Sequence, residues 1–363
     1  MQLLLINFAT DPDHPAWGFA VRWIEALAGR VTFLHVISMQ VATTHLPDNV
    51  RVYSMGKEMR LARSRILANF YGHLSRVLRE NDIDVCFCHM NVMFGILGAP
   101  LLKAHGVPIV TWYAHPTVNR MLKTAHWLSD RVVSSLPTTY PYKHDKLAVV
   151  GQGIDTTLFA PGSTAPETPP MILCVGRLSP AKGHLTLLKA AALLRDRWNR
   201  PFQVVILGGP AARIDEAYIT SLRALTEELK LQDIVQFQPP APWAALPEWY
   251  RRCTIQVNLT PNGYGDKVAW EAMSCARPCV VANPGFAETL GQHTPDLLFR
   301  YGDHEDLAAK MIALLNLPAD ARGRMGTDLR EQVGRLHNIE TLADRLVLIF
   351  QDVLERSRGR RSA

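Results

Sequence analysis

Short apolar runs of strand length alternate along the chain with segments in which apolar residues recur at helical spacing. Residues 1–161 contain seven such runs, which are LLLINF, VTFLHVI, VRVYSM, DVCFCHM, VPIVTWYA, RVVSSL and LAVVGQG. A second series of six begins at Met171 and consists of MILCVGRL, FQVVILGG, DIVQFQ, TIQVNL, PCVVAN and LLFRY. Strands that alternate with helices form parallel sheets whose two faces are covered. The pattern therefore predicts an α/β protein with two doubly wound, Rossmann-like domains.

The connector between the two series, APGSTAPETPP, is rich in Pro, Gly and Thr and is typical of a domain boundary near residues 160–170. A chain of 363 residues is also too long for one ordinary core. We predict a first domain over residues 1–161 and a second over residues 170–338. An amphipathic segment near residues 339–357 predicts a last helix, followed by a basic tail that ends at residue 363.

The stretch GYGDKVAWEAMSCARPCVV, residues 263–281, places a glycine-containing loop and a helix start between two predicted strands. Asp266 stands where it can cap the helix, and the free N–H groups and positive dipole end there favour a bound anion. Glu271 follows about a turn and a half later, where a carboxylate can accept hydrogen bonds from two neighbouring sugar hydroxyls. We expect the phosphate and sugar of a ligand at this helix start.

A second candidate motif, VGRLSPAKG, follows the first strand of the second domain and contains Arg177 and Lys182. Glycine in such a turn lets the backbone approach a ligand closely, while the two cations offset the charge of a diphosphate. The next glycine pair, Gly208 and Gly209, could form a ligand-binding loop, but a tight strand-to-helix turn explains it equally well. These residues strengthen the expectation of a diphosphate site.

In the first domain, two histidines follow predicted strands, where ligands of doubly wound sheets bind. His115 comes after the run VPIVTWYA and is our candidate for a catalytic group. His89 has a similar place, but we expect it to be a packed histidine. Gly18 lies after the first predicted strand and opens a predicted helix.

Taken together, these motifs resemble those of the retaining GT-B glycosyltransferases of family 4, the glycosyl transferases group 1. The donor-site signature of that family runs E-x7-E-A-M-x-x-G-x-P-V-V, and its second glutamate corresponds to Glu271. Its first glutamate falls on Gly263, and its glycine falls on Ala276. A left-handed conformation at Ala276 would cost about 1 kcal/mol relative to glycine. The family pattern V-G-R-L-x-x-x-K-G matches residues 175–183 at every specified position.

The resemblance implies that the two Rossmann-like domains face a central cleft, which is the GT-B arrangement. It also implies that the first domain binds the acceptor, that the second binds the nucleotide sugar donor, and that the helix within residues 339–363 crosses back onto the first domain. It implies transfer of a hexose with retention, from a nucleotide diphosphate sugar to a saccharide or lipid-linked saccharide acceptor, in the synthesis of cell-surface polysaccharide or glycolipid. The implied catalytic residues are His115, Arg177 and Lys182. The implied donor-binding residues are Gly18, Gly176, Arg177, Lys182, Gly265, Asp266, Lys267, Val268 and Glu271. The resemblance implies no metal ion and no cofactor besides the nucleotide sugar co-substrate.

Two other functions remain open from the sequence. The loss of the first family glutamate at Gly263 would also suit a transferase-like binding subunit without activity, and a GT-B sugar-nucleotide epimerase would need the same donor motifs. The pair Asp11 and Asp13 has the spacing of a metal-binding D-x-D motif, but we expect it to form a turn. A G-x-G-x-x-G motif after the first strand is missing, which disfavours a dinucleotide dehydrogenase.

Charge and composition limit the partners. The net charge is +6, and the segment of residues 57–80 carries six basic residues against two acidic ones, which leaves open an anionic membrane surface as a partner. A solvated helix face explains the same charges. Basic residues are not interleaved with aromatics, so we expect no nucleic acid binding. Six cysteines in apolar segments without metal-ligand spacing, a first segment unlike a signal peptide and no run of transmembrane length predict a cytoplasmic protein, with the inner face of the membrane as the open alternative.

Overall fold

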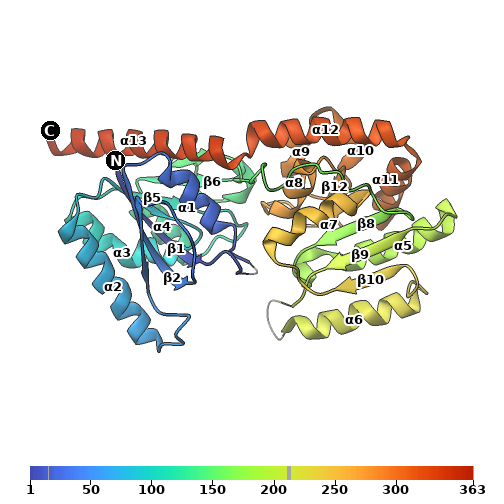
Figure 1. Ribbon diagram of the computed structural model, residues 1–363, viewed down its shortest axis with the longest axis horizontal. Coiled ribbons are helices and arrows are strands. Elements are labelled where there is room, and N and C mark those ends of the chain that lie inside the picture. The colour runs from blue at the N-terminus through green and yellow to red at the C-terminus, as the bar shows by residue number, and fades with distance from the viewer. Residues whose placement is uncertain (15, 211–213, 363) are drawn as a thin grey trace. The chain divides into compact units, whose positions relative to one another are not determined.

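The computed structural model describes residues 1–14, 16–210 and 214–362, which divide into two compact units. The first unit comprises Met1–Gly153 and Ile339–Ala363, and the second comprises Ile154–Asn338 (Figure 1). The predicted boundary near residue 161 is therefore about eight residues too late. The cause is local, because the backbone N–H of Ile154 donates to the carbonyl of His337 and Phe159 is fully buried in the second unit.

The first unit is built on a parallel sheet with the strand order β3-β2-β1-β4-β5-β6-β7. Its strands are β1 (Gln2–Thr10), β2 (Phe33–Val41), β3 (Val50–Ser54), β4 (Val85–Cys88), β5 (Ile109–Trp112), β6 (Arg131–Ser134) and β7 (Leu147–Val149). Its helices are α1 (Ala20–Ala28), α2 (Arg63–Glu80), α3 (Val92–Ala104), α4 (Arg120–Leu128) and α13 (Ile339–Ser362), with a 3-10 turn η1 (Pro137–Thr139). The central strand β1 is apolar throughout its middle, and Leu3 to Ile6 are completely buried because helices cover both faces of the sheet.

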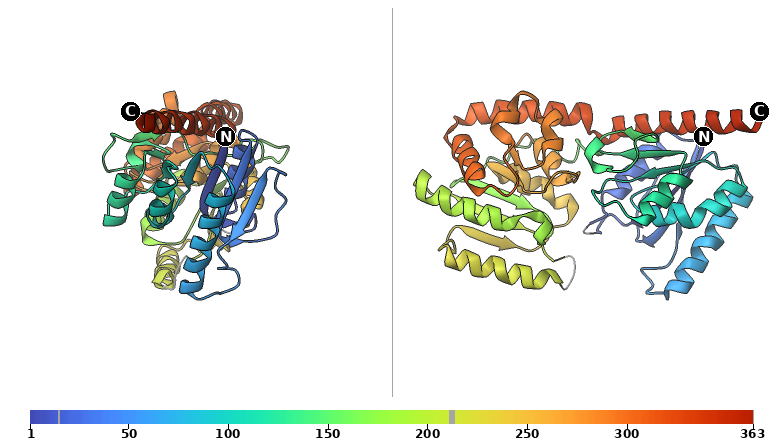
Figure 2. Two further views of the ribbon diagram at one scale, coloured as in Figure 1. Left: turned by 90° about the vertical axis from the view of Figure 1, so that its left-hand side faces the viewer. Right: turned by 180° about the vertical axis from the view of Figure 1, so that it is seen from behind.

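Helices α2, α3 and α4 lie side by side on one face of this sheet, whereas α1 packs against α13 (Figure 2). The direction of the crossovers explains this division. The connection from β1 to β2, which contains α1, runs one way along the sheet, whereas the connections from β3 to β4, β4 to β5 and β5 to β6, which contain α2, α3 and α4, run the other way. Because such connections are right-handed, the two sets of helices lie on opposite faces. The last helix continues to Ser362, so the segment expected as a basic tail is part of α13.

The second unit has a smaller parallel sheet with the strand order β10-β9-β8-β11-β12. Its strands are β8 (Met171–Val175), β9 (Gln203–Leu207), β10 (Val235–Gln238), β11 (Ile255–Asn258) and β12 (Cys279–Val281). Its helices are α5 (His184–Trp198), α6 (Ile214–Glu228), α7 (Leu246–Arg252), α8 (Lys267–Ser274), α9 (Ala287–Leu290), α10 (Thr294–Leu297), α11 (His304–Asn316) and α12 (Ala319–Leu336), with the 3-10 turns η2 (Pro180–Lys182), η3 (Trp243–Ala245), η4 (Pro284–Phe286) and η5 (Gly291–His293). The run LLFRY, predicted as a sixth strand, makes only an isolated bridge from Leu298 to Val281.

Two sequence expectations about the core agree with the structure. All six cysteines are free and buried. His89 is also packed, with 1% of its surface exposed and its ring stacked on that of Trp23 at a centroid distance of 4.3 Å. Within the described residues, no helix is both long enough and apolar enough to span a bilayer.

Helix α12 holds the end of α8 in place through a close backbone contact. Ala276, just after α8, has the left-handed conformation with φ of 57°, as the family glycine at this position suggested. A Cβ atom on Gly326 of α12 would lie 2.1 Å from the carbonyl oxygen of Ala276. Arg330, one turn further along α12, donates to the carbonyl oxygens of Ser274 and Phe159. The contact between α12 and α8 therefore requires glycine at position 326.

We expect Gly326→Ala to destabilise the second unit by roughly 2 to 3 kcal/mol, because the new methyl group overlaps a backbone oxygen that cannot move freely. Gly334→Ala in the same helix meets no atom within 4 Å and should stabilise by about 0.5 to 1 kcal/mol through helix propensity. Urea unfolding of both variants measures the difference. Equal stability of the two would show that α12 does not depend on this contact.

Candidate functional site

The strand order of the second unit creates a switch point between β8 and β11. The chain runs from β8 to β9 and β10 on one side and returns to β11 on the other, and ligands of doubly wound sheets bind at the carboxyl ends of the strands at such a point. The motif of residues 175–183 follows β8, and the stretch that begins at Gly263 follows β11. The two motifs that the sequence singled out are therefore neighbours in space.

Glycine is required at the turn after β8. Gly176 has φ of 142°, and a Cβ atom on Gly208, from the loop after β9, would lie 1.8 Å from the carbonyl oxygen of Gly176. The side chain of Lys182 passes over Gly176, since a Cβ atom there would lie 3.7 Å from the Lys182 Nζ. Gly183 is left-handed and packs against Leu259 of the opposite loop. The close packing of these loops directs Lys182 across the switch point.

Lys182 forms an ion pair with Asp266, and both side chains are largely buried, with 16% and 13% exposed. The same Asp266 oxygen, Oδ2, accepts a hydrogen bond of 2.8 Å from Asn258 Nδ2 at the end of β11. The hydroxyl of Thr260 donates to the Asn258 Oδ1 over 2.5 Å, which fixes the orientation of the Asn258 amide. Asp266 is at the N-cap of α8 but makes no capping hydrogen bond through its side chain. The expectation that Asp266 caps the helix is therefore wrong, because its carboxylate turns toward Lys182.

The other predicted residues of this edge have different environments. Arg177 is exposed, and its guanidinium makes no hydrogen bond or ion pair within the part of the chain that the structure describes. Gly265 lies in the loop before α8, and the preceding carbonyl of Tyr264 accepts a 2.7 Å hydrogen bond from the side chain of Asn283 after β12. Lys267 and Val268 form the first turn of α8, and burial lowers the pKa of Lys267. Three adjacent strand ends thus contribute to one edge.

Glu271 lies inside the unit, with only 3% of its surface exposed. Its Oε2 accepts a hydrogen bond of 2.9 Å from the hydroxyl of Tyr250, and its Oε1 accepts one of 3.3 Å from the indole of Trp243. Burial raises the pKa of Glu271 to about 7, against the opposing effect of these donors and of Lys267. Each carboxylate oxygen is already engaged, so the ribose contact expected for this residue would have to use its remaining lone pairs.

His184 is the first residue of α5, is buried, and lies close to Lys182 in the sequence. The sequence analysis did not name it as a site residue. It is 1% exposed, and its ring lies 6.0 Å from that of Tyr218. Burial, reinforced by the charge of Lys182, lowers the pKa of His184 to about 4. The imidazole is therefore neutral at pH 7 and adds no charge next to Lys182.

In the first unit, the switch point lies between β1 and β4. Gly18 is in the loop after β1, where a Cβ atom would lie 2.5 Å from the carbonyl oxygen of Pro12. The next residue, Phe19, contacts the ring of His89 after β4 at a centroid distance of 6.3 Å. His115 follows β5, one strand further along, and is exposed. Its Nδ1 accepts a hydrogen bond of 3.2 Å from the backbone N–H of Thr117. Gly18 and His89 thus follow the two strands of the switch point, and His115 follows the next strand of the sheet.

The Asp11 and Asp13 pair forms a turn, as expected. The carboxylate of Asp11 accepts from the backbone N–H of Asp13 over 3.0 Å, so the first carboxylate faces the backbone of the second residue. Among the described residues, no group of three or more His, Cys, Asp or Glu side chains is arranged to hold a metal ion.

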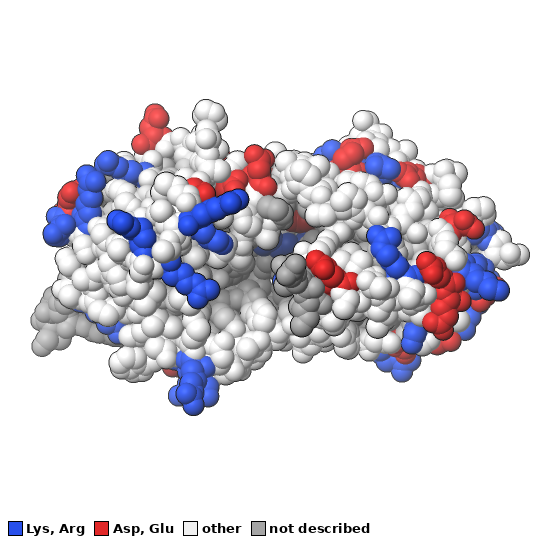
Figure 3. Space-filling model, turned by 90° about the horizontal axis from the view of Figure 1, so that it is seen from below, with Lys and Arg blue, Asp and Glu red and all other residues white. Residues whose placement is uncertain are grey.

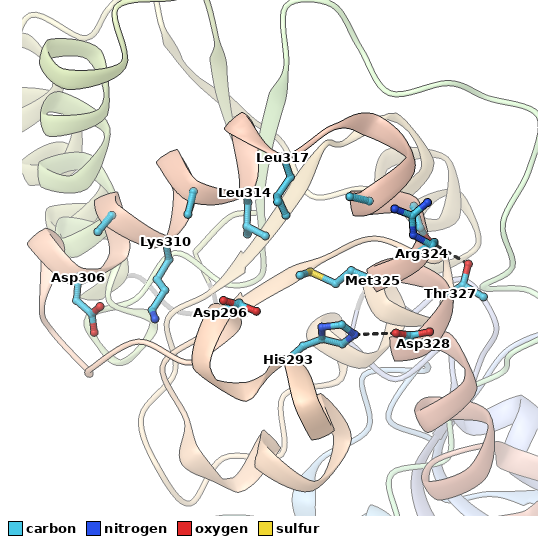
Figure 4. A pocket seen from close by; sticks show the side chains of 14 residues that line it. His293, Asp296, Asp306, Lys310, Leu314, Leu317, Arg324, Met325, Thr327 and Asp328 are labelled. Carbon is cyan, nitrogen blue, oxygen red and sulfur yellow. Dashed lines mark hydrogen bonds and ion pairs between the residues drawn. The ribbon is translucent and has the colours of Figure 1, made fainter.

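A cavity of about 990 Å³ lies elsewhere in the second unit, between α10, α11 and α12 (Figure 4). Apolar side chains such as Leu314 and Met325 line its floor, and His293 is paired with Asp328 at 2.9 Å on one side. None of the residues predicted for the site lines this cavity. The predicted residues lie at strand ends, whereas this cavity is formed by helices that cover the sheet.

The sequence analysis did not predict several residues that the structure places at the site. Asn258 carried a weak signal, because it is a polar residue at the end of the apolar run TIQVNL. Tyr250 and Trp243 carried none, since an aromatic residue before a strand is ordinarily part of the core. Their contact with Glu271 depends on how α7 packs on α8.

Comparison with known proteins gives a family match for most of the second unit and similar folds for nearly the whole chain. Residues 155–332 match the family described as Glycosyl transferases group 1. A D-inositol 3-phosphate glycosyltransferase of Thermobispora bispora is 28% identical over 248 residues, which cover 63% of this chain and 57% of that protein. This chain therefore spans little more than half the length of that relative.

Solved structures match nearly the whole chain. HepE of Anabaena, in complex with UDP and glucose, superposes with a TM-score of 0.75 at 16% identity, covering 97% of this chain and 99% of that one. Sucrose-phosphate synthase of Thermosynechococcus elongatus superposes with a TM-score of 0.78 at 19% identity, covering 98% and 100%. The fold is accordingly the GT-B class, with two Rossmann-like domains built on parallel sheets.

The buried His184 leads to a pH prediction. The native unit keeps this imidazole neutral down to about pH 4, whereas the unfolded chain protonates it near pH 6.5. Its contribution to stability is therefore complete above pH 6.5 and is lost as the pH falls toward 4. The wild type should lose roughly 3 kcal/mol more than His184→Gln between pH 7.5 and pH 4.

Urea unfolding of both proteins at the two pH values measures this difference, and all other titrating groups cancel in the comparison. A parallel loss of stability in the two proteins would contradict the burial of a neutral imidazole at position 184.

Proposed function

We propose that the protein is a glycosyltransferase that moves a hexose from a nucleotide diphosphate sugar to a saccharide or lipid-linked saccharide acceptor. The observation that carries this proposal is the position of Lys182, which is held over the Gly176 turn at the switch point of a unit that matches a glycosyltransferase family. A compact cation beside a glycine turn suits a phosphate ligand. Relatives of similar fold, such as HepE, are described in complex with UDP and glucose, which supports a nucleotide sugar as donor.

In the proposed mechanism, charge that develops on the departing diphosphate is stabilised by Lys182, by Arg177 and by the start of α8. Arg177 is exposed, so its side chain is able to turn toward a ligand at the strand ends. The backbone N–H groups of Lys267 and Val268 belong to the first turn of α8, where the helix dipole favours negative charge. Such preorganised groups stabilise a transition state without a metal ion. We therefore propose that no metal and no further cofactor take part.

Glu271 is proposed to hold the ribose through its remaining lone pairs, and His115 to hydrogen-bond the transferred sugar. The acceptor attacks from the face that the diphosphate leaves, which gives retention. A role in the synthesis of cell-surface polysaccharide or glycolipid is proposed from the resemblance of the motifs. Gly263, buried with φ of 90°, offers no side chain to the sugar, which keeps a transferase-like binding subunit as the alternative.

We expect Lys182→Ala and Arg177→Ala each to lower donor turnover at least tenfold, because loss of one group that stabilises transition-state charge costs roughly 2 to 4 kcal/mol. The assay presents UDP-, GDP-, ADP- and dTDP-hexoses with a panel of acceptors in buffer that contains EDTA, and mass spectrometry and NMR identify the product and its anomeric configuration. Arg300→Ala, at an exposed site after β12, serves as a control for a lost cation.

Each other result of the turnover assay would contradict a different part of the proposed function. Unchanged turnover in both variants would remove these cations from the mechanism. Activity that needs Mn²⁺ or Mg²⁺ would contradict metal independence, and a changed sugar without acceptor would indicate an epimerase. No turnover of any donor that binds would favour the binding subunit.

We further propose that the first unit docks on an anionic membrane surface, where a lipid-linked acceptor would be found. Large apolar side chains are exposed near the first turns of the three adjacent helices α2, α3 and α4, with Leu67, Met93 and Met121 between 39% and 45% exposed. No acidic residue lies in the first turn of any of these helices. On the face of the molecule drawn in Figure 3, Lys and Arg side chains are spread among uncharged residues, with some Asp and Glu side chains between them. Apolar groups beside positive charge favour the interface of anionic lipids.

The triple variant Leu67→Gln, Met93→Gln and Met121→Gln should bind vesicles of phosphatidylglycerol at least tenfold more weakly than the wild type, because each change removes apolar area that would enter the interface. Leu348→Gln on α13 is the matched control, since Leu348 is 65% exposed but belongs to the opposite face of the sheet. Co-sedimentation measures both. Equal binding of all proteins, or equal binding to phosphatidylcholine, would refute the proposed surface.

A further inference from the structure

Lys182, the cation assigned to the donor, already has an anionic partner in this structure. The carboxylate of Asp266 pairs with its ammonium, and both side chains are shielded from solvent over more than four fifths of their surface. The two residues lie before the two helices at the switch point, Lys182 at the end of the 3-10 turn that precedes Gly183 and α5, and Asp266 at the N-cap of α8. A carboxylate therefore occupies the place at which a phosphate would meet Lys182.

Asp266 is held in this position from a second side. Its Oδ2 accepts from Asn258 Nδ2 over 2.8 Å, and Thr260 fixes the Asn258 amide through its hydroxyl and its backbone N–H, at 2.5 and 3.3 Å from the Asn258 Oδ1. Asn258 and Thr260 are themselves buried, with 2% and 1% exposed. The carboxylate is consequently anchored to the end of β11 and does not depend on Lys182 alone for its position.

The choice of partner has an electrostatic consequence. A side chain that caps a helix would satisfy the N–H groups at the start of α8, but the Asp266 side chain makes no such hydrogen bond. Instead it neutralises Lys182, and the adjacent His184 is neutral as well because burial lowers its pKa to about 4. Arg177 is then the remaining unneutralised cation of the motif of residues 175–183.

We propose that Asp266 is an internal counter-ion that competes with the diphosphate of the donor for Lys182 and thereby limits the affinity of the site for nucleoside diphosphates. An ammonium group has three donors, so Lys182 can contact a phosphate while it keeps Asp266, but the phosphate and the anchored carboxylate then repel each other at close range. Asp266 therefore lowers the affinity of the site for a diphosphate and does not contribute a favourable contact to it. The inference rests on the proposed function, because it takes the diphosphate of a nucleotide sugar as the ligand of Lys182.

This arrangement links the ion pair to the release of product. A transferase that uses a nucleotide sugar leaves a nucleoside diphosphate on the cation after the sugar has departed, and that product carries more negative charge than the donor. The anchored carboxylate repels the more highly charged ligand more strongly, so it favours exchange of product for donor. The pair between Lys182 and Asp266 re-forms when the product leaves.

Binding of nucleoside diphosphates to neutral variants tests the proposal. Asp266→Asn keeps the shape of the side chain, and Asp266→Ser is a second neutral replacement with a residue favoured at an N-cap. We expect both to bind the nucleoside diphosphate that the wild type binds among UDP, GDP, ADP and dTDP five- to twentyfold more tightly in isothermal titration. Inorganic pyrophosphate should show a gain of the same direction, and the corresponding uncharged nucleoside should show none.

Two controls separate the local charge from general effects. Asp266→Glu keeps the charge and should bind diphosphate no more tightly than the wild type. Asp320→Asn removes the same charge from an exposed ion pair with Arg324 in α12 and should leave diphosphate affinity unchanged. Thermal unfolding of each variant shows whether it is folded, and the two neutral variants are read independently.

The proposal is overturned if both neutral variants bind diphosphate as tightly as the wild type or more weakly, since Asp266 would then support Lys182 instead of competing for it. An equal gain for the uncharged nucleoside would also overturn it, because the loop rather than the charge would have changed. If the wild type binds a nucleoside diphosphate but the variants show no gain, only this inference fails. If no variant and no wild type binds any nucleoside diphosphate or pyrophosphate, the proposed function fails with it.

Discussion

The close approach of two backbone loops at the carboxyl end of β8 is the constraint on which the rest of the second unit depends. Gly176 and Gly208 lie so near each other that any side chain at position 208 would overlap a carbonyl oxygen. This approach lets the turn after β8 pass beneath the side chain of Lys182, and the left-handed Gly183 brings the same loop against Leu259. A larger residue at these turns would move Lys182 away from the switch point, and the site would lose its central cation.

Charge at this edge is balanced more closely than the sequence alone indicates. Two cations in one motif suggest a strongly positive pocket, yet Lys182 is paired with Asp266 and His184 is neutral. Under the proposed function, a site whose central cation is already paired would bind a diphosphate reversibly, as repeated turnover requires.

Helix α8 has a polar first residue, Lys267, and a buried acidic residue, Glu271, in its middle. Glu271 is held by Tyr250 and Trp243, two donors from the segment that includes η3 and α7, so the helix is fixed along its buried side. Its far end is fixed by α12, where Gly326 fits against the left-handed Ala276. The middle and the far end of the helix that presents Lys267 and Val268 are thus fixed by packing within one unit, which gives the N–H groups of the helix start a defined direction.

The sequence by itself determined the alternation of strands and helices, the two series of strands and the two motifs after β8 and β11, because burial of parallel strands demands apolar runs and tight turns demand glycine. It also predicted the packed His89, and the family pattern raised a left-handed conformation at Ala276 that the structure shows. It placed the domain boundary about eight residues too late and expected a strand at LLFRY, since a local pattern does not reveal which unit a connector packs against. Only the tertiary structure decided that Asp266 pairs with Lys182, that Glu271 is buried against Tyr250, and that His184 is neutral. Each of these depends on side chains brought together from strand ends and helices far apart in the chain, and no local spacing encodes the distance between them.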